Sequence, residues 1–268
     1  MGVMELKRWL TALFLIPLLI LVVGYGSQQV FFGVLLVTII LATHEFYSLV
    51  LPGDHRKEKI LGILSVSFLA YGIYRGDDHF ILGFSAFITI FLLIFFLINV
   101  EDLSSVVPTL GKLLIGIFYI GLLFSHLTLI RGLPLGKQWV FFTLAVTFMG
   151  DTASYYGGSY FGRHKLYPRI SPGKTIEGSL WGFAGNIGGA LIFMQYFLEQ
   201  LEIYHCLILA VGLGIMGQVG DLCESMIKRS VGVKDSGSLL PGHGGILDRI
   251  DSILFSSPFL YYYAIIFL

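Results

Sequence analysis

The sequence predicts an all-α integral membrane protein with about nine transmembrane helices. Of its 268 residues, 56% are hydrophobic and only 13% are charged. Apolar runs of about 20 residues, the length at which a helix crosses ~30 Å of hydrocarbon, recur from one end of the chain to the other. No alternation of apolar and polar residues is long enough to indicate a β-barrel. A bundle of membrane-spanning helices is therefore the expected fold.

The predicted spans follow these apolar runs in order. They cover residues 9–26, 30–51, 59–75, 79–98, 111–130, 139–161, 178–198, 204–229 and 245–267. The first run could be mistaken for a signal peptide, but it lacks a small-residue cleavage site and many more spans follow it. We therefore interpret it as a retained helix.

The basic residues between the spans predict the orientation, because cytoplasmic loops are rich in Lys and Arg. With the N-terminus in the cytoplasm, only Arg75, Arg131 and Lys137 fall outside, whereas the other basic residues between spans fall inside. We expect a multi-pass protein of the plasma or inner membrane with its N-terminus in the cytoplasm and its C-terminus outside. The net charge of zero gives no indication of a nucleic-acid partner.

Residues 1–135 are expected to form a transmembrane scaffold within one continuous membrane domain. One pair of ionisable residues, His44-Glu45, interrupts the apolar pattern of this region near the end of the second span. This ionisable pair either forms a contact of its own, faces a polar cavity or serves a structural role at the helix end. Residues 136–268 are expected to form the catalytic region, because the ionisable groups gather there.

The catalytic region begins with a polar stretch inside the sixth span. Asp151 lies about ten residues from the cytoplasmic end of that span, roughly 15 Å along a helix, and Thr152, Ser154 and Tyr155 stand beside it. The glycines of this span, which permit close helix packing in membranes, are Gly150, Gly157, Gly158 and Gly162. Asp151 either bonds to a neighbouring helix or, as we expect, lines a polar functional cavity.

A basic loop follows the sixth span at residues 163–178. Its cationic residues either set the topology or grip the phosphates of a lipid or nucleotide; they include Arg163, Lys165 and Lys174. Ser171, Lys174 and Thr175 also form a compact donor set just before a helix, whose N-terminus favours anions. We expect this loop to bind phosphate.

The stretch 220–252 is the densest in ionisable residues. Asp221, Glu224 and Lys228 are spaced three and four apart and so share one helical face, and Asp248 and Asp251 share a face of the last helix. Charges beside lipid are costly unless they are paired, metal-bound or wetted. Because Mg²⁺ takes one or two carboxylates plus substrate phosphates, Asp221 and Asp248 are its predicted ligands.

The predicted partners for phosphate in this stretch are cationic side chains and glycine amides. They are Lys228, Arg229, Lys234, Arg249, Gly244 and Gly245. The alternative is that the charges form buried ion pairs that hold two helices together, such as Asp251 with Arg249 or with Lys228. The number of acids and bases around a glycine-rich loop exceeds what packing requires, so we favour a phosphate-and-metal site.

The chain also resembles the phosphatidate cytidylyltransferases, or CDP-diacylglycerol synthases. The family signature appears as Ser225-Met226-Ile227-Lys228-Arg229, Lys234-Asp235, Gly237, Leu240-Pro241, His243-Gly244-Gly245, Asp248-Arg249 and Asp251. A second block, Asp151-Thr152-Ala153 followed by FGRHKL and SPGKTIEG, is similar as well. The two blocks cover the C-terminal half, whereas the N-terminal half is similar only in being multi-helical.

The resemblance implies transfer of CMP from CTP to phosphatidic acid, giving CDP-diacylglycerol and pyrophosphate in phospholipid biosynthesis. It implies Mg²⁺ dependence, room for a monovalent cation such as K⁺, and a homodimer. With this resemblance, Asp151, Glu224 and Asp251 are expected to support the Mg²⁺ ligands or bind a further cation. His243 would then donate to a phosphate or to the leaving pyrophosphate, beside Lys228 and Arg249 in the catalytic set.

Two other functions are compatible with the pattern. A CTP-dependent polyprenol or phytol kinase would transfer the γ-phosphate to an alcohol and release CDP. An ion-coupled secondary transporter would use acids near the membrane midplane, and it would show inverted repeats and discontinuous helices. The chain shows no internal repeat, and its ionisable cluster lies in one half.

Overall fold

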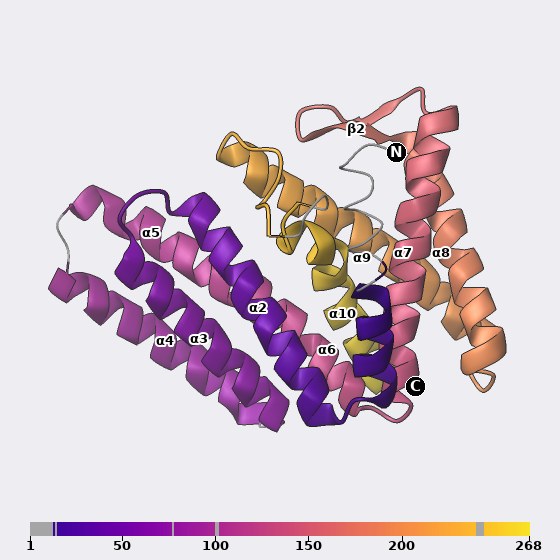
Figure 1. Cartoon of the computed structure of the whole chain (residues 1–268), viewed down its shortest axis with the longest axis horizontal. Helices are drawn as coiled ribbons and strands as arrows, with labels where there is room; N and C mark the ends of the chain where they lie inside the picture. Colours follow the sequence, from indigo (N-terminus) through magenta and orange to yellow (C-terminus); the bar gives the residue numbers. More distant parts are fainter. Residues whose placement is uncertain (1–12, 14, 77, 100–101, 240–243) are drawn as a thin grey trace. The chain divides into compact units, whose positions relative to one another are not determined.

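The structure, a computed structural model, describes residues 13, 15–76, 78–99, 102–239 and 244–268. It is built almost entirely of helices, with one short hairpin (Figure 1). The helical elements are η1 (Leu21–Tyr25, a π-helix), α2 (Gln28–Val50), α3 (Arg56–Arg75), α4 (Asp78–Asn99), α5 (Leu103–Gly116), η2 (Ile117–Leu122, a π-helix), α6 (Leu123–Gly132), α7 (Gly136–Phe161), α8 (Ile176–Phe197), α9 (Ile203–Ser230) and α10 (Leu247–Phe267).

The described helices lie where the apolar runs predicted them, so the all-α class is confirmed. Residues 9–12 and 14 of the first predicted span lie outside the described residues. The fifth predicted span is longer than expected, because α5, η2 and α6 form one helical run from Leu103 to Gly132. Within the described residues, five helical segments are long and apolar enough to cross a membrane. They are Gln28–Val50, His79–Asn99, Leu103–Gly132, Ile203–Ser230 and Leu247–Phe267. The count of nine crossings and the sides of the two termini stay predictions.

The chain divides into two compact units. The first consists of residues 1–129 with 235–247, and the second of residues 130–234 with 248–268. The loop that follows α9 therefore packs with the first unit, whereas α10 belongs to the second from Asp248 onward. The predicted functional division between residues 135 and 136 stays a prediction.

The first unit is held together by large side chains seated against glycines. Tyr47 of α2 is fully buried, and its hydroxyl donates to the carbonyl of Leu113 in α5 at 2.9 Å. A Cβ atom at Gly62 of α3 would lie 2.3 Å from the Tyr47 ring, and one at Gly116 would lie 2.5 Å from it. These two glycines therefore make the space in which α2, α3 and α5 pack around one tyrosine.

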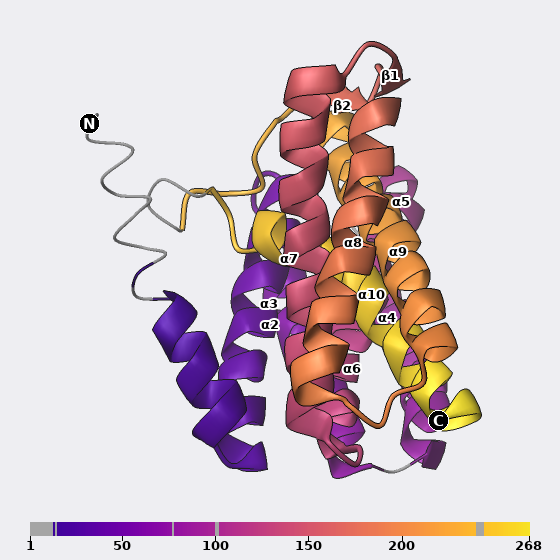
Figure 2. The same cartoon turned by 90° about the vertical axis from the view of Figure 1, so that its right-hand side faces the viewer.

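The second unit packs α7, α8 and α9 side by side (Figure 2). Asn186 of α8 is buried between two glycines: a Cβ at Gly150 of α7 would lie 1.7 Å from its Oδ1, and one at Gly214 of α9 would lie 2.1 Å from its Nδ2. Gly157 admits Trp181 of α8 in the same way, at 2.3 Å. The predicted role of the glycines in the sixth span, close helix approach, is confirmed at Gly150 and Gly157.

Helix α10 lies closely against α9. A Cβ at Gly220 of α9 would lie 2.5 Å from the carbonyl oxygen of Asp251, and one at Gly217 would lie 3.5 Å from the side chain of Ser252. Further along, Nδ1 of His205 and the hydroxyl of Tyr263 are 2.7 Å apart. The glycines thus bring the acidic ends of α9 and α10 into one neighbourhood.

The basic loop between α7 and α8 contains a hairpin that the sequence did not indicate. Strand β1 (Lys165–Tyr167) pairs antiparallel with β2 (Ser171–Thr175), with Lys165 opposite Thr175. Both strands are too short and too polar to show the apolar alternation by which strands are recognised in a sequence. The hairpin stands at the C-terminal end of α7 and the N-terminal end of α8 (Figure 1).

Candidate active site

A cavity of about 520 Å³ in the second unit gathers many of the predicted site residues. They come from α7, from the hairpin, from α9 and from α10. The predicted residues that line it are Asp151, Ser171, Lys174, Thr175, Asp221, Asp248, Arg249 and Asp251. Groups from four separate parts of the sequence thus meet around one space.

One ion pair joins the hairpin to α9 across this cavity. Nζ of Lys174 in β2 lies 2.6 Å from Oδ2 of Asp221, with 27% and 32% of the two side chains exposed. Because both groups remain partly accessible, each can exchange its partner for a ligand. Lys174 is thus placed to exchange the carboxylate for a phosphate oxygen.

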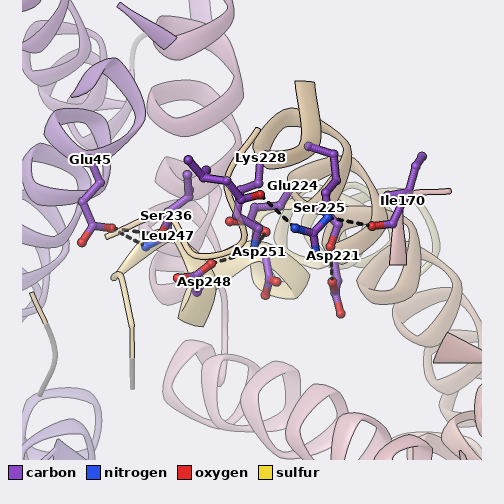
Figure 3. Close-up of polar contacts among 12 residues, drawn as sticks. Glu45, Ile170, Asp221, Glu224, Ser225, Lys228, Ser236, Leu247, Asp248 and Asp251 are labelled. Carbon is purple, nitrogen blue, oxygen red and sulfur yellow. Dashed lines mark hydrogen bonds and ion pairs between the residues drawn. The ribbon is translucent and has the colours of Figure 1, made fainter. Parts of the chain in front are cut away.

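A second group of charges lies more deeply between α9 and α10 (Figure 3). Nζ of Lys228 donates to Oδ1 of Asp248 at 2.6 Å and also contacts Oε2 of Glu224. Only 1% of the Glu224 side chain and 12% of the Lys228 side chain are exposed. The two pairs offered as examples of the alternative, Asp251 with Arg249 and Asp251 with Lys228, are not among the ion pairs of the described residues. Glu224, one turn before Lys228 on the same helix face, is a closer partner.

Asp151 and Asp251 are the cavity carboxylates without a cationic partner among the described residues. Oδ2 of Asp151 accepts from the hydroxyl of Ser252 at 3.4 Å, and Oδ1 of Asp251 accepts from the Ser252 amide at 2.7 Å. Arg249 lines the same cavity without a hydrogen bond or ion pair to any described residue. The site therefore offers both carboxylates and a cation that an incoming ligand can engage.

The N-terminus of α8 is already capped by the chain. The hydroxyl of Thr175 accepts from the Gly178 amide at 3.1 Å, and the Ile176 amide donates to the carbonyl of His164 at 2.9 Å. Two of the first amides of the helix are therefore used, which weakens the expectation of an anion site formed by the backbone alone. Ser171 and Lys174 remain the accessible donors of the set at the cavity wall.

Glu177 fastens the start of the hairpin to α8. Its carboxylate accepts from the amides of Arg163 at 3.0 Å and His164 at 3.1 Å, and it lies 2.6 Å from Nδ1 of His164. The hydrogen bond from the Arg163 amide, followed by that from the His164 side chain, lowers the pKa of Glu177 to about 2. This carboxylate therefore stays ionised and holds the loop that carries Lys174.

Several predicted phosphate-binding residues lie outside the cavity lining. The guanidinium of Arg229 donates to two backbone carbonyls, those of Ile170 at 3.2 Å and Val233 at 3.0 Å. This arrangement joins the hairpin turn to the end of α9. The other predicted residues that do not line the cavity are Arg163, Lys165, Glu224, Lys228 and Lys234.

Two of the predicted phosphate-binding residues, Gly244 and Gly245, belong to the glycine-rich loop after α9. Gly244 and Gly245 belong to the first unit, where Gly245 lies against Glu45 and Ser236. His243 lies outside the described residues. The proposed roles of these three residues in binding phosphate stay predictions.

The cavity also contains residues that the sequence pattern did not single out. Gln218 of α9 and Ser179 of α8 form two hydrogen bonds: the Ser179 hydroxyl donates to Oε1 of Gln218, and Nε2 of Gln218 donates to the backbone carbonyl of Ser179 at 3.2 Å. Gln218 lies three residues before Asp221, so helical spacing could have placed it on the same face. Ser154 and Tyr155 also line the cavity, as their position beside Asp151 suggested.

The donor set suits a hard divalent cation that shares its coordination with a substrate. Within the described ranges, no three His, Cys, Asp or Glu side chains form a preformed metal-binding group. Mg²⁺ does not need one, because it is commonly held by one or two carboxylates together with substrate phosphates and water. Four carboxylates around one cavity, two of them without a cationic partner among the described residues, fit this mode of binding.

Comparison with known proteins identifies the family. The sequence model of the Cytidylyltransferase family matches residues 6–267, which is nearly the whole chain. The chain belongs to this family. The resemblance drawn from the motifs of residues 151–178 and 225–251 is therefore confirmed.

The curated relatives carry a more specific name. A protein named phosphatidate cytidylyltransferase from Bacillus subtilis (strain 168) is 43% identical over 162 residues, which are 59% of each of the two chains. Proteins of the same name are 42% identical over 147 residues in Staphylococcus saprophyticus and 41% identical over 153 residues in Brucella suis biovar 1. The chain thus aligns with little more than half the length of these relatives.

Proposed function

We propose that this cytidylyltransferase transfers CMP from CTP to phosphatidic acid, giving CDP-diacylglycerol and pyrophosphate. The observation that carries the proposal is the cavity in which Asp151, Lys174, Asp221 and Asp248 meet, since it joins the two sequence blocks that resemble the family. The names of the curated relatives support the same reaction. The substrates are CTP and a membrane lipid, and no nucleic acid takes part.

The reaction is an in-line displacement at the α-phosphorus of CTP. An oxygen of the lipid phosphate forms the new P–O bond, the bond to the bridging oxygen of the β-phosphate breaks, and pyrophosphate leaves. The lipid phosphate is already ionised, so the enzyme needs no strong base. Such chemistry depends mainly on positioning and on neutralising charge.

The cationic side chains of the cavity perform that neutralisation. Lys174 exchanges Asp221 for a phosphate oxygen, and Arg249 binds a second phosphate group. Lys228 contributes indirectly, because its contacts with Asp248 and Glu224 fix the position of the Asp248 carboxylate. The proposed phosphate-binding set also retains Arg163, Lys165, Arg229 and Lys234, which do not line the cavity, together with the loop residues His243, Gly244 and Gly245.

Asp221 and Asp248 are the proposed ligands of Mg²⁺, and Asp151 and Asp251 support them or hold a monovalent cation such as K⁺. When bound, Mg²⁺ would neutralise phosphate charge and orient the pyrophosphate leaving group. The four carboxylates make the cavity favourable to cations before any substrate enters. Glu224 does not line the cavity. It contacts Lys228, which in turn contacts Asp248, so it supports the position of Asp248 indirectly.

The proposed setting is the cytoplasmic face of the plasma or inner membrane, where CTP is found. The acyl chains of the lipid stay in the bilayer, and its headgroup enters the cavity from the side. A homodimer and a place in phospholipid biosynthesis complete the proposal. A lipid kinase using CTP is the nearest rival function, and it would release CDP in place of pyrophosphate.

Replacing the proposed metal ligands one at a time tests the assignment. Asp221→Asn and Asp248→Asn should each lower the CTP-dependent formation of lipid product in detergent by about 100-fold or more, because each removes one anionic Mg²⁺ ligand. Asp54→Asn, in an exposed turn, is the matched control and should leave the rate unchanged. Near-normal turnover in either cavity variant would remove that residue from the metal site.

A further inference from the structure

Glu45 is an acidic residue buried in the candidate membrane-spanning helix α2. Only 4% of its surface is exposed. A carboxylate in such a place is costly unless it receives hydrogen bonds or a counter-charge. Within the described part of the chain no Lys, Arg or His forms an ion pair with it. Its partners among the described residues are therefore neutral donors.

Those donors come from the loop after α9, about two hundred residues later in the chain. The amide of Leu247 donates to Oε2 of Glu45 at 3.0 Å. The hydroxyl of Ser236 donates to the same oxygen at 3.4 Å (Figure 3). One carboxylate thus binds both the start and the end of the segment 236–247.

Two glycines leave the room that the carboxylate occupies. A Cβ atom at Gly237 would lie 2.6 Å from Oε1 of Glu45, and one at Gly245 would lie 2.7 Å from Oε2 and 2.0 Å from the hydroxyl oxygen of Ser236. Any side chain at either position would collide with the group that binds the loop. The absence of a side chain at Gly237 and Gly245 therefore leaves room for the Glu45 carboxylate.

The bond to Leu247 has the character of a helix cap supplied from another element. Leu247 is the first residue of α10, whose first amides have no partner within the helix. Helices usually satisfy such amides with a Ser, Thr, Asp or Asn just before the first turn, but the residues before Leu247 are Gly244, Gly245 and Ile246. The negative charge of Glu45 also suits the positive end of the helix dipole.

We infer that Glu45 is a positioning residue for the reaction: by capping α10 at Leu247 it fixes the place of Asp248, the next residue in the chain. The inference rests on the proposed function, because it gives Asp248 a role in catalysis. Glu45 itself does not touch the substrate. Its effect reaches the chemistry through the first turn of α10.

Three variants separate this role from a general effect on α2. Glu45→Ala removes both acceptor oxygens, whereas Glu45→Gln keeps a carbonyl oxygen that can accept from the Leu247 amide. His44→Ala changes the exposed neighbour on the same helix. Glu45→Ala should lower kcat by about tenfold or more with the KM for CTP changed by less than about threefold, because it disturbs the reacting geometry and leaves the cations that bind CTP in place. Glu45→Gln and His44→Ala should stay within about threefold of the wild-type kcat.

Hydrogen exchange provides a readout that does not depend on activity. Peptides covering residues 245–251 of the full-length protein in detergent should exchange about tenfold faster or more in Glu45→Ala, and at the wild-type rate in Glu45→Gln and His44→Ala. Gly245→Ala offers a second route if Glu45→Ala does not fold. It keeps the carboxylate but displaces it, so it should show the same loss of kcat and the same faster exchange.

Wild-type exchange in residues 245–251 of both Glu45→Ala and Gly245→Ala would overturn the inference, as would an unchanged kcat in both. Equal losses in Glu45→Gln and Glu45→Ala would also overturn it, because capping requires only an acceptor. If the wild-type protein transfers no CMP, the proposed function fails, while the exchange experiment still tests the cap.

Discussion

At the scale of single residues, the charges of the second unit have two different tasks. Lys174 and Asp221 are partly exposed and open to a ligand, whereas Lys228, Glu224 and Asp248 form a buried group between α9 and α10. Removing a buried cation from between two carboxylates destabilises the fold, because it leaves two buried negative charges without a counter-charge. The stability of this group can be tested separately from activity.

Lys228→Met should lower the free energy of unfolding by about 3–5 kcal/mol, because it leaves Glu224 and Asp248 buried without their cation. Adding Glu224→Gln to that variant should recover part of the loss. Lys57→Met, at an exposed position, should change the stability by less than about 0.5 kcal/mol. Thermal unfolding in detergent is the measurement. Lys228→Met unfolding like the wild type would show that the buried group contributes nothing to stability.

The residues that helical spacing could place were those that lie on one element. The three-residue and four-residue intervals of α9 and α10 predicted acids on shared faces, and the structure brings Asp221, Asp248 and Asp251 to one cavity. Spacing could not predict that Glu224 would be buried and would not line the cavity, because burial depends on how the neighbouring helix packs. It also could not connect Glu45 with Leu247, because no periodicity links residues on separate elements.

At the scale of elements, the hairpin β1–β2 is held in place by side-chain hydrogen bonds from α8 and α9. Glu177 binds the amides of Arg163 and His164, and Arg229 binds the carbonyl of Ile170. Apolar runs could predict the helices of this chain because the bilayer demands a fixed length of hydrophobic residues. They could not predict a short polar hairpin, whose pairing depends on side chains from α8 and α9.

Glu177→Ala should loosen the hairpin and raise the KM for CTP by about threefold to tenfold, because the hairpin carries Lys174. The matched control, Glu199→Ala in an exposed turn, should leave the KM unchanged. An unchanged KM in Glu177→Ala would show that this carboxylate does not position the hairpin.

The ionisation of the same carboxylate predicts how the hairpin responds to pH. The pKa of Glu177 is lowered from its ordinary value of 4.5 to about 2 in the fold, so its stabilising contribution is present above pH 4.5 and is lost as the pH falls through about 2. Hydrogen-exchange protection at Arg163 and His164, corrected for the intrinsic pH dependence, should therefore weaken as the pH falls from about 4.5 to about 2. Unchanged protection across that acid range would mean that another group holds the hairpin.

At the scale of the whole molecule, the orientation in the membrane decides which substrates reach the cavity. The two ends of α7 provide a matched pair of sites for thiol labelling after both native cysteines, Cys206 and Cys223, are replaced by Ser. Arg169→Cys in the hairpin turn should react with a membrane-impermeant reagent only after the cells are opened. Lys137→Cys at the other end should react from outside. The reverse pattern would overturn the predicted orientation.

The proposed reaction differs from its nearest rival in the phosphorus atom attacked, which is the α-phosphorus of CTP. The purified protein in detergent should be supplied with Mg²⁺, with phosphatidic acid and a polyprenol as acceptor lipids, and with CTP labelled either at the α-phosphorus or at the γ-phosphorus. We expect the α-label to appear in the lipid and the γ-label in pyrophosphate. A γ-label in the lipid, with CDP as the co-product, would contradict the proposed reaction and identify the chain as a lipid kinase.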